Sequence, residues 1–213
     1  MDSPQKDLVV VTGFGPFRQY LVNSSWEAAK GLKKAGLREG SEVCIVEIPV
    51  SYSKAQQVLA EIWHTVKPKV AVHLGIAPGA KCIILEQTAK NHGYKERDVC
   101  GSCPANNCCV EGGADQLDSI IGMRSLAKHL KGLGLDVIYS RDAGRYLCDF
   151  VYYCSLHYGQ RRAAFIHVPA SGNLARPEIL VPQLQAIMQA LLRQMDTLRT
   201  SPTASECQPA SAT

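Results

Sequence analysis

The chain has 213 residues, of which 46% are hydrophobic and 20% are charged, so it can bury one sizeable core and we expect one compact domain. The net charge is only +4, and the 23 Lys and Arg residues are spread along the sequence instead of forming one basic block. This pattern disfavours a nucleic-acid partner and a membrane-surface partner.

The first half of the chain alternates short apolar runs with helical patterns. Residues 8–12 and 42–49 are rich in β-branched residues and are the first two predicted strands. Between them a helix is predicted over 23–36, because Asn and Ser side chains can cap its first amides and a glycine ends it. Another helix is predicted over 53–66, where apolar residues recur every three or four positions until Pro68 stops the pattern.

The second half continues this alternation. Residues 70–74, 135–140 and 163–168 are short runs rich in Val, Ile or Leu, as buried parallel strands are. Residues 177–198 place Leu, Ile and Met on one face and predict a packed terminal helix. Residues 87–117 carry Gly, Asn and four cysteines with little periodicity, which predicts a long excursion across the sheet. Excursions of this length are often functional.

Alternating strands and helices are typical of a parallel sheet with helices on both faces. We therefore predict an α/β fold, a single-domain three-layer α/β/α sandwich around a mostly parallel twisted sheet, over residues 1–199. After this segment the sequence becomes rich in Ser, Thr, Ala and Pro and loses its periodicity, which predicts a disordered C-terminal tail over residues 200–213.

The cysteines and the N-terminus indicate a cellular compartment. The polar N-terminus runs into an apolar stretch over residues 8–11 that is too short for a signal-peptide core. No later segment approaches the roughly 20 apolar residues of a membrane span. Nine cysteines without a secretory signal are typical of reduced thiols, and the odd count disfavours a complete disulfide framework. We expect a cytosolic protein with no membrane partner and at least one free thiol.

Cys148 is the first candidate for a reacting group. Residues 140–150 join a predicted strand to an amphipathic run, so Cys148 is expected near the start of a helix. The unpaired amides and the dipole of a helix start favour an anion and can supply a thiolate at neutral pH. The alternative is that Cys148, flanked by Leu147 and Phe150, is a small buried apolar side chain.

A nucleophilic cysteine needs a proton acceptor, and His167 stands near the end of a predicted strand. Ligand sites of open parallel sheets collect at the carboxyl ends of the strands, so His167 and the turn before Cys148 can meet there. Glu86 ends an apolar run and can fix the imidazole tautomer and stabilise its charged form. Taken alone, His167 also suits a structural histidine and Glu86 an exposed strand-end charge.

The Gly-rich segment 12–17 follows the first predicted strand. It lacks both the Gly-x-Gly-x-x-Gly spacing and the Gly-Lys-Ser/Thr ending of phosphate-binding loops. Its proline and two aromatic residues suit an apolar pocket with Phe14 and Phe17 as walls. The alternative is that both side chains belong to the core.

The cysteine-rich stretch also raises a zinc hypothesis, because four thiolates can form a structural tetrahedral site. Cys100-x-x-Cys103 and the Cys108-Cys109 pair would supply them. Adjacent cysteines are awkward ligands, and no second Cys-x-x-Cys is present, so we expect no metal. A cysteine-rich metal-binding module remains a rival hypothesis.

Four segments together resemble the pyroglutamyl-peptidase I family, omega peptidases that remove an N-terminal pyroglutamyl residue. The resemblance runs from about residue 8 to about residue 195, in the family's order and approximate spacing. The stretch 100–113 resembles the vertebrate members, and the chain is most similar to their pyroglutamyl-peptidase I-like branch. The four segments are Thr12-Gly-Phe-Gly-Pro-Phe17, Val22-Asn-Ser-Ser-Trp26, Asp142-Ala-Gly-Arg-Tyr-Leu-Cys-Asp149 and His167-Val-Pro169.

The resemblance implies a cysteine peptidase whose triad is Cys148, His167 and Glu86. For such a triad we expect a reaction that passes through a thioester on Cys148. It also implies that Phe14 and Phe17 contact the pyroglutamyl ring. The expected mechanism needs no metal or organic cofactor. The expected partners are N-terminally pyroglutamylated peptides, and the oligomeric state stays open.

The chain departs from the family pattern in several positions. Arg18 stands where glycine is expected after the second Phe, Ala170 replaces a proline, and the loop 77–81 differs from the vertebrate one. Lys95 is the nearest candidate for the arginine that stabilises the oxyanion in microbial members. These differences keep open the alternative of a catalytically silent paralogue that binds pyroglutamyl peptides or a protein partner.

Overall fold

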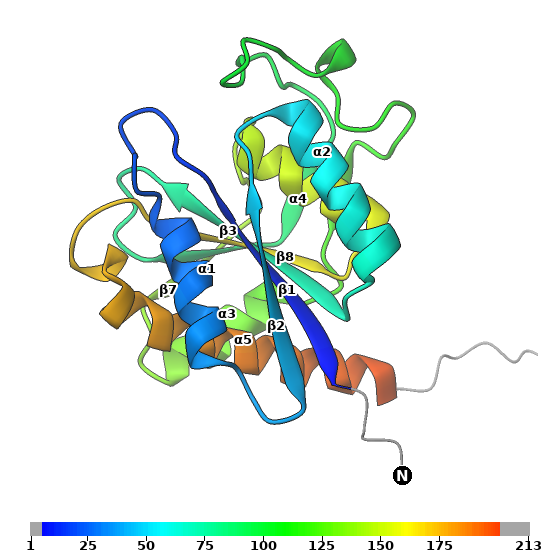
Figure 1. Ribbon diagram of the computed structural model, residues 1–213. Coiled ribbons are helices and arrows are strands. Elements are labelled where there is room, and N and C mark those ends of the chain that lie inside the picture. Colours follow the sequence, from blue (N-terminus) through cyan, green and yellow to red (C-terminus); the bar gives the residue numbers. More distant parts are fainter. Residues whose placement is uncertain (1–5, 201–213) are drawn as a thin grey trace, which may run out of the picture.

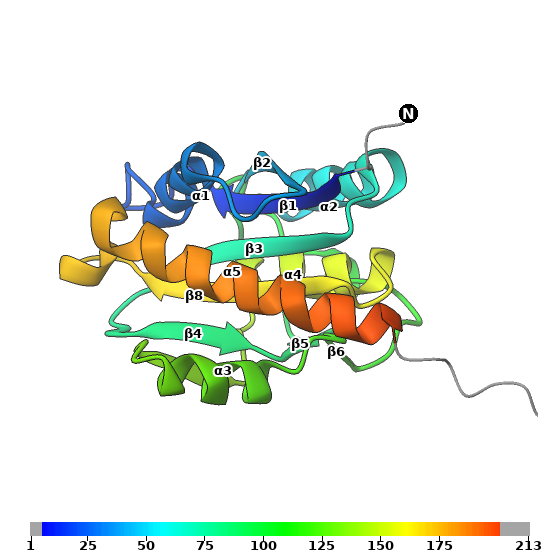
Figure 2. The same ribbon diagram turned by 90° about the horizontal axis from the view of Figure 1, so that it is seen from below.

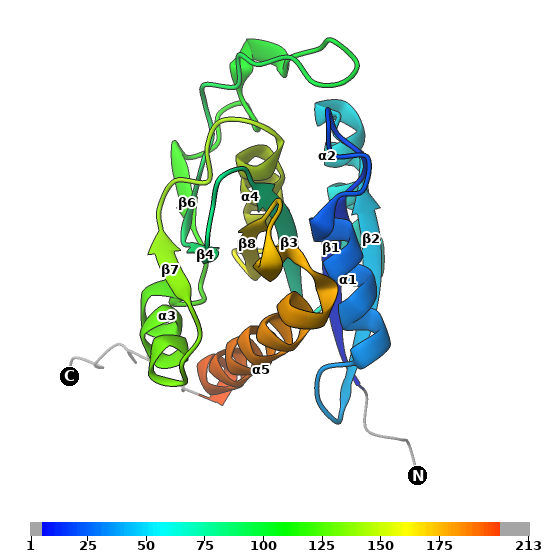
Figure 3. The same ribbon diagram turned by 90° about the vertical axis from the view of Figure 1, so that its left-hand side faces the viewer.

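Six strands form one mixed sheet in the computed structural model, which describes residues 6–200. Figure 1 shows the whole chain, and the strand order across the sheet, β2-β1-β3-β8-β4-β7, can be followed in Figure 3. Neighbouring strands run parallel except β4 and β8, which are antiparallel, so β4 and β7 run against the other four strands. The strands are β1 (Asp7–Phe14), β2 (Ser41–Ile48), β3 (Val70–Ala77), β4 (Ile83–Glu86), β7 (Val137–Ser140) and β8 (Ala163–Pro169).

Five α-helices cover the two faces of this sheet. Buried side chains of α1, α3 and α5 pack on one face, and those of α2 and α4 pack on the other. Figure 2 and Figure 3 show α5 and α4 on opposite sides of the strands. The predicted α/β/α sandwich around a mostly parallel sheet is therefore confirmed. The helices are α1 (Ser24–Ala35), α2 (Tyr52–Glu61), α3 (Met123–Gly132), α4 (Leu147–Tyr158) and α5 (Pro177–Thr200).

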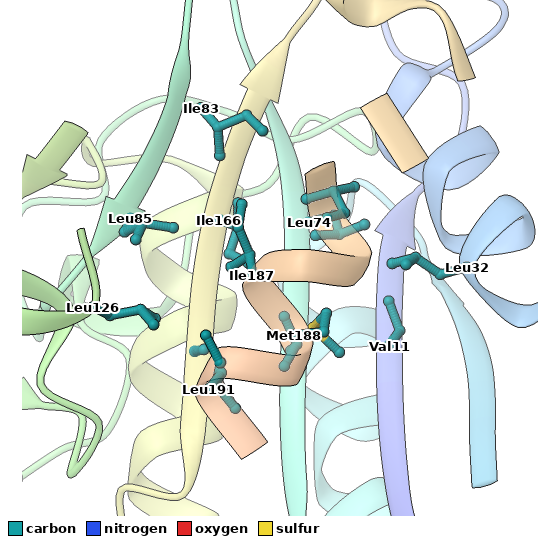
Figure 4. Packing of buried hydrophobic residues seen from close by; sticks show 14 of the residues in the cluster. Val11, Leu32, Leu74, Ile83, Leu85, Leu126, Ile166, Ile187, Met188 and Leu191 are labelled. Atoms are coloured by element: carbon teal, nitrogen blue, oxygen red, sulfur yellow. The ribbon is translucent and has the colours of Figure 1, made fainter. Parts of the chain in front are cut away.

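The larger core lies between the sheet and α1, α3 and α5. Successive residues of a strand point to opposite faces, so alternate strand residues contribute to this core. The long helix α5 supplies apolar residues spaced three and four apart, which form one packing face. Figure 4 shows Ile187, Met188 and Leu191 of α5 among Val11, Leu74, Ile83, Leu85 and Ile166 of the strands, with Leu32 and Leu126 from α1 and α3.

All five predicted strands are present, and α1 and α5 begin and end close to their predicted bounds. The helix predicted over 53–66 is present as α2 followed by a π-helical turn, Ile62–Val66. β4 and α3 are not among the predicted elements. The four-residue β4 is too short to give a periodic signal. The apolar residues of α3 do recur at helical spacing, but they alternate with many basic residues, and no helix was predicted from them.

The excursion predicted over 87–117 is present, and two short strands pair with each other at its two ends. β5 (Thr88–Lys90) and β6 (Gln116–Asp118) pair antiparallel in a separate two-stranded sheet. The chain between them, green in Figure 1, extends beyond α2 and α4. The tail predicted from residue 200 lies outside the described residues, apart from Thr200, which ends α5. Within residues 6–200, no helix combines the length and apolarity needed to cross a membrane.

A buried polar chain links the sheet to α4. Thr12 Oγ1 lies 2.8 Å from His73 Nδ1, and His73 Nε2 lies 2.6 Å from Ser155 Oγ. Ser155 Oγ also accepts a hydrogen bond of 2.8 Å from Trp63 Nε1. His73 has no exposed surface, and burial lowers its pKa to about 3. The imidazole is therefore neutral in the folded protein at neutral pH.

The free energy of unfolding is expected to fall as the pH drops from about 6.5 toward about 3, because His73 takes up a proton in the unfolded chain but resists protonation when folded. The slope from this group reaches at most about 1.4 kcal/mol per pH unit. Urea unfolding at pH 7, 5 and 4 measures the slope. The His73→Gln variant should lose this component, and equal slopes in the two proteins would contradict the prediction.

Candidate active site

His167 and Glu86 meet on one face of the sheet although they lie 81 positions apart in sequence. In the antiparallel pair of β8 and β4, Phe165 lies opposite Glu86, and His167 follows two residues later on β8. Residues two apart on a strand point to the same face, so Glu86 and His167 are diagonal neighbours. His167 Nδ1 lies 2.9 Å from Glu86 Oε1. This hydrogen bond fixes the orientation of the imidazole ring.

The pair is almost completely buried, because His167 is 7% exposed and Glu86 is 1% exposed. Glu86 Oε2 is buried and has no hydrogen-bond partner among residues 6–200, so the carboxylate interacts with the imidazole through Oε1 alone. Burial lowers the pKa of His167, but the neighbouring Cys148 and Glu86 side chains outweigh it and raise the pKa to about 10. His167 is therefore protonated at neutral pH.

Cys148 is the second residue of α4, which packs on the face of the sheet that carries His167. It is partly exposed, so the thiol is not sealed in the core. Gly75 lies beside His167 in the register of β3 and β8, and a β-carbon at Gly75 would stand only 2.8 Å from Cys148 Sγ. The missing side chain of Gly75 therefore makes room for the thiol beside the imidazole.

The N-terminus of α4 supplies further polar groups. The N-cap residue Tyr146 is extended and makes no side-chain capping hydrogen bond. The first amides of a helix have no intrahelical acceptor, so the amides around Cys148 are free to bind an anion. The structure thus places the thiol at a helix start, where the sequence analysis expected it.

A cavity of about 650 Å³ opens over these side chains, a size typical of small-molecule sites. Glu86, Cys148 and His167 all line it. The lining is largely apolar and includes Phe14, which is buried at the end of β1, and Phe17, which is partly buried. The sequence-predicted residues are thus brought to one cavity by segments that lie far apart in the chain.

Phe14 and Phe17 are held by the start of α1. The Phe14 amide donates a 3.0 Å hydrogen bond to Ser25 Oγ, and Asn23 Nδ2 donates one of 3.0 Å to the Gly15 carbonyl. The Gly-rich loop and the Asn-Ser-Ser segment that follows it therefore form one local unit. Phe14 belongs both to the core and to the cavity wall, so the two readings of this residue are compatible.

Asp149 is a buried carboxylate beside Cys148 that the sequence analysis does not assign a role. It accepts a 2.9 Å hydrogen bond from the Tyr94 hydroxyl and one of 3.3 Å from the Lys90 amide, and it pairs with Arg145 at 3.2 Å. Burial raises the pKa of Asp149 to about 6 despite these contacts. Asp149 ties the start of α4 to β5 and the segment after it. The helix dipole by itself favours an acidic residue in a first turn, so the local pattern does not indicate that Asp149 is buried.

Lys95 and the cysteines of residues 100–109 are not among the cavity-lining residues, whereas Arg18, Ala77 and Pro78 are. Lys95 is exposed, and the structure does not bring it to the reacting groups. Cys100 and Cys103 are exposed, and Cys109 is buried. Within residues 6–200 every cysteine is a free thiol, and no group of three or more His, Cys, Asp or Glu side chains is arranged to hold a metal ion.

Comparisons with known proteins agree with this fold and with the family resemblance. A family model described as pyroglutamyl peptidase matches residues 7–193. The chain belongs to the pyroglutamyl peptidase family. Mouse pyroglutamyl-peptidase 1 is 44% identical over 194 residues, which cover 90% of this chain and 92% of the mouse protein. The human pyroglutamyl-peptidase 1-like protein is 40% identical over 168 residues, which cover 77% of this chain and 85% of the human protein.

Solved structures of pyrrolidone carboxyl peptidases share the architecture. The enzyme from Fervidobacterium islandicum superimposes with a TM-score of 0.78 at 30% identity, and the match covers 88% of this chain and 99% of that chain. A mutant of the Pyrococcus furiosus protein superimposes with a TM-score of 0.79 at 27% identity, with the same coverage. The family resemblance of the sequence is therefore confirmed.

Proposed function

We propose that this member of the pyroglutamyl peptidase family is a cysteine-type omega peptidase that hydrolyses the bond after an N-terminal pyroglutamyl residue. The observation that carries the proposal is the hydrogen bond between Glu86 and His167 at the wall of a cavity that also contains Cys148. Relatives of the chain named pyroglutamyl-peptidase and pyrrolidone-carboxylate peptidase support the same reaction.

The lactam ring of the substrate enters the apolar part of the cavity. Phe14 and Phe17 supply walls that favour an uncharged cyclic terminus over a hydrated ammonium group, because an unpaired charge is costly to bury. The cavity therefore selects N-terminally pyroglutamylated peptides. With the lactam ring bound against these walls, the carbonyl of the pyroglutamyl residue lies near Cys148, which lines the same cavity.

Protonated His167 stabilises the Cys148 thiolate, and the thiolate attacks the carbonyl carbon of the pyroglutamyl residue. The free amides at the start of α4 bind the resulting oxyanion. As the C–N bond breaks, His167 gives its proton to the departing amine, and a thioester remains on Cys148. Water then attacks the thioester and passes a proton to His167, which releases pyroglutamate and regenerates the ion pair. Glu86 keeps the ring oriented throughout.

A matched pair of fluorogenic amides tests the proposal. The pyroglutamyl amide should be hydrolysed, whereas the prolyl amide, with the same ring size but a charged nitrogen, should react more than about 100-fold more slowly. If the protein is folded and Cys148 is reactive but neither amide is hydrolysed, the peptidase proposal is wrong. If the pyroglutamyl amide then still protected Cys148 from iodoacetamide, the silent binding paralogue would be favoured.

A further inference from the structure

The charged side chains that line the cavity occur in pairs of opposite sign. The pair beside Cys148 is buried, whereas the pair at the outer rim has side chains that are 58% and 52% exposed. Apart from the reacting Cys148 thiolate, each charged side chain of the lining therefore has a partner of opposite sign. The pairs are Glu86 with His167, Asp142 with Arg145, and Arg18 with Glu96.

Arg18 is held at the tip of a tight turn. The backbones of Phe17 and Tyr20 exchange two hydrogen bonds of 3.0 and 2.9 Å around it. Its φ angle of 50° lies in the left-handed region that favours glycine, which explains why glycine suits this position. The guanidinium carbon lies 4.7 Å from the centre of the Phe17 ring and 6.0 Å from that of Tyr146. Arg18 thus lies against the aromatic wall of the cavity.

Glu96 lies on a separate segment whose backbone is anchored. The Tyr52 hydroxyl donates a 2.9 Å hydrogen bond to the Glu96 carbonyl, and the Tyr146 hydroxyl donates one of 3.2 Å to the Arg97 carbonyl. Glu96 and Arg18 are 78 positions apart in sequence and form an ion pair. The pair therefore links the turn after β1 to the segment after β5 at the cavity rim.

The Arg18–Glu96 pair lies where the part of the peptide that follows the pyroglutamyl residue leaves the cavity. Phe14 and His167 are buried, whereas Arg18 and Glu96 are more than half exposed, so the cavity leads from an enclosed inner end to an open rim. A ring bound at the inner end leaves the rest of the peptide to pass the rim. Of the three pairs that line the cavity, Arg18–Glu96 is the one in which both side chains are more than half exposed, because Asp142 is 64% exposed but its partner Arg145 only 33%. The first side chain after the pyroglutamyl residue approaches this pair at the rim.

We infer that the Arg18–Glu96 pair determines which residue is accepted after the pyroglutamyl residue and that it favours an uncharged side chain. The inference rests on the proposed function and concerns the specificity of the same site. An acidic side chain meets the carboxylate of Glu96, and a basic one meets the guanidinium of Arg18, so either must compete with the existing pair. An uncharged side chain leaves the pair intact.

Neutral substitutions separate the two charges. Arg18→Asn keeps a residue that tolerates the left-handed conformation and leaves the Glu96 charge unpaired, so it should favour a basic residue after pyroglutamate. Glu96→Gln leaves Arg18 unpaired and should favour an acidic one. Because each exposed contact changes affinity about two- to fivefold, the ratio of kcat/KM for pyroglutamyl-lysyl over pyroglutamyl-glutamyl peptides should shift roughly 4- to 25-fold, in opposite directions.

The shift should lie mainly in KM, since the pair does not touch the reacting atoms, and it should shrink in 0.5 M salt. The double variant should return to a ratio near that of the wild type. Arg176→Gln, which breaks an exposed pair with Glu178 away from the cavity, is the matched control and should leave the ratio unchanged. An unchanged ratio in both single variants, or shifts in the same direction, would overturn the inference while leaving the peptidase intact.

The role of the Arg18–Glu96 pair can also be tested if the protein does not hydrolyse the peptides. The same two peptides are then compared by their protection of Cys148 against iodoacetamide, read by mass spectrometry of the Cys148 peptide. Opposite shifts of protection in Arg18→Asn and Glu96→Gln would support the role of the pair, even though the peptidase had failed. Protection that does not depend on these substitutions, or no protection at all, would overturn the inference.

Discussion

Replacing Cys148 with alanine should lower kcat/KM for a pyroglutamyl amide by about 10⁴-fold or more, because removing the nucleophile of a catalytic triad leaves only binding and oxyanion stabilisation. The thiol is partly exposed at the start of α4, so its removal should change the free energy of unfolding by no more than about 1 kcal/mol. Activity would thus be lost from a folded protein. Steady-state kinetics together with thermal unfolding check both expectations.

Cys82→Ala is the matched control for this experiment. Cys82 is also a partly exposed free thiol, but it lies before β4 and is not part of the cavity lining. This variant should keep wild-type kcat/KM. If Cys148→Ala retained more than about a tenth of the activity, another group would have to be the nucleophile and the triad hypothesis would be wrong.

Replacing Glu86 with glutamine should lower kcat by roughly 10²- to 10⁴-fold, because the amide keeps the shape but removes the charge that orients and stabilises the imidazolium. In the wild type, the raised pKa of His167 should place the alkaline limb of the rate profile near pH 10, where the proton needed by the leaving amine is lost. In Glu86→Gln the limb should move to lower pH. Rate profiles from pH 6 to 11 measure both effects.

The raised pKa of His167 also makes the free energy of unfolding depend on pH. The folded pKa of about 10 lies above the ordinary value of 6.5, so the stabilisation is fully present below about pH 6.5 and is lost as the pH rises through about 10. Glu86→Gln should weaken this alkaline loss of stability. Glu42→Gln, an exposed position on β2, serves as the control and should alter neither profile. A limb that stays in place in Glu86→Gln would show that the carboxylate does not act on His167.

The strands and helices that carry the site could be predicted from local patterns. The runs that become β1 and β8 are continuous and apolar because both faces of these strands are buried, and α1 carries its own capping signal at Asn23. Cys148 was expected at a helix start and His167 near a strand end, and the structure places them there. Local signals suffice for such features because they depend on neighbours in the chain.

The position of Glu86 could not be predicted from local patterns. Its strand, β4, is only four residues long and runs antiparallel to β8. A strand end at Glu86 is raised by the sequence only as an exposed charge, and the direction of the strand is not predicted. The direction matters because it places Glu86 two residues diagonally from His167 on the same face. The roles of Gly75 and Asp149 also depend on distant parts of the chain. Gly75 leaves space for the sulfur atom of Cys148 on α4, and Asp149 is covered by β5 and by Tyr94 in the segment after it.

By itself, the sequence determined the order of the main elements, the α/β class and the residue types that can form a thiol–imidazole–carboxylate system. Only the tertiary structure decided that Glu86 bonds His167, that Cys148 stays partly exposed beside them, and that Arg18 pairs with Glu96 at the rim. The physical reason is that propensity and periodicity act over a few residues, whereas burial, pKa shifts and ion pairing depend on groups that the fold brings together from distant parts of the chain.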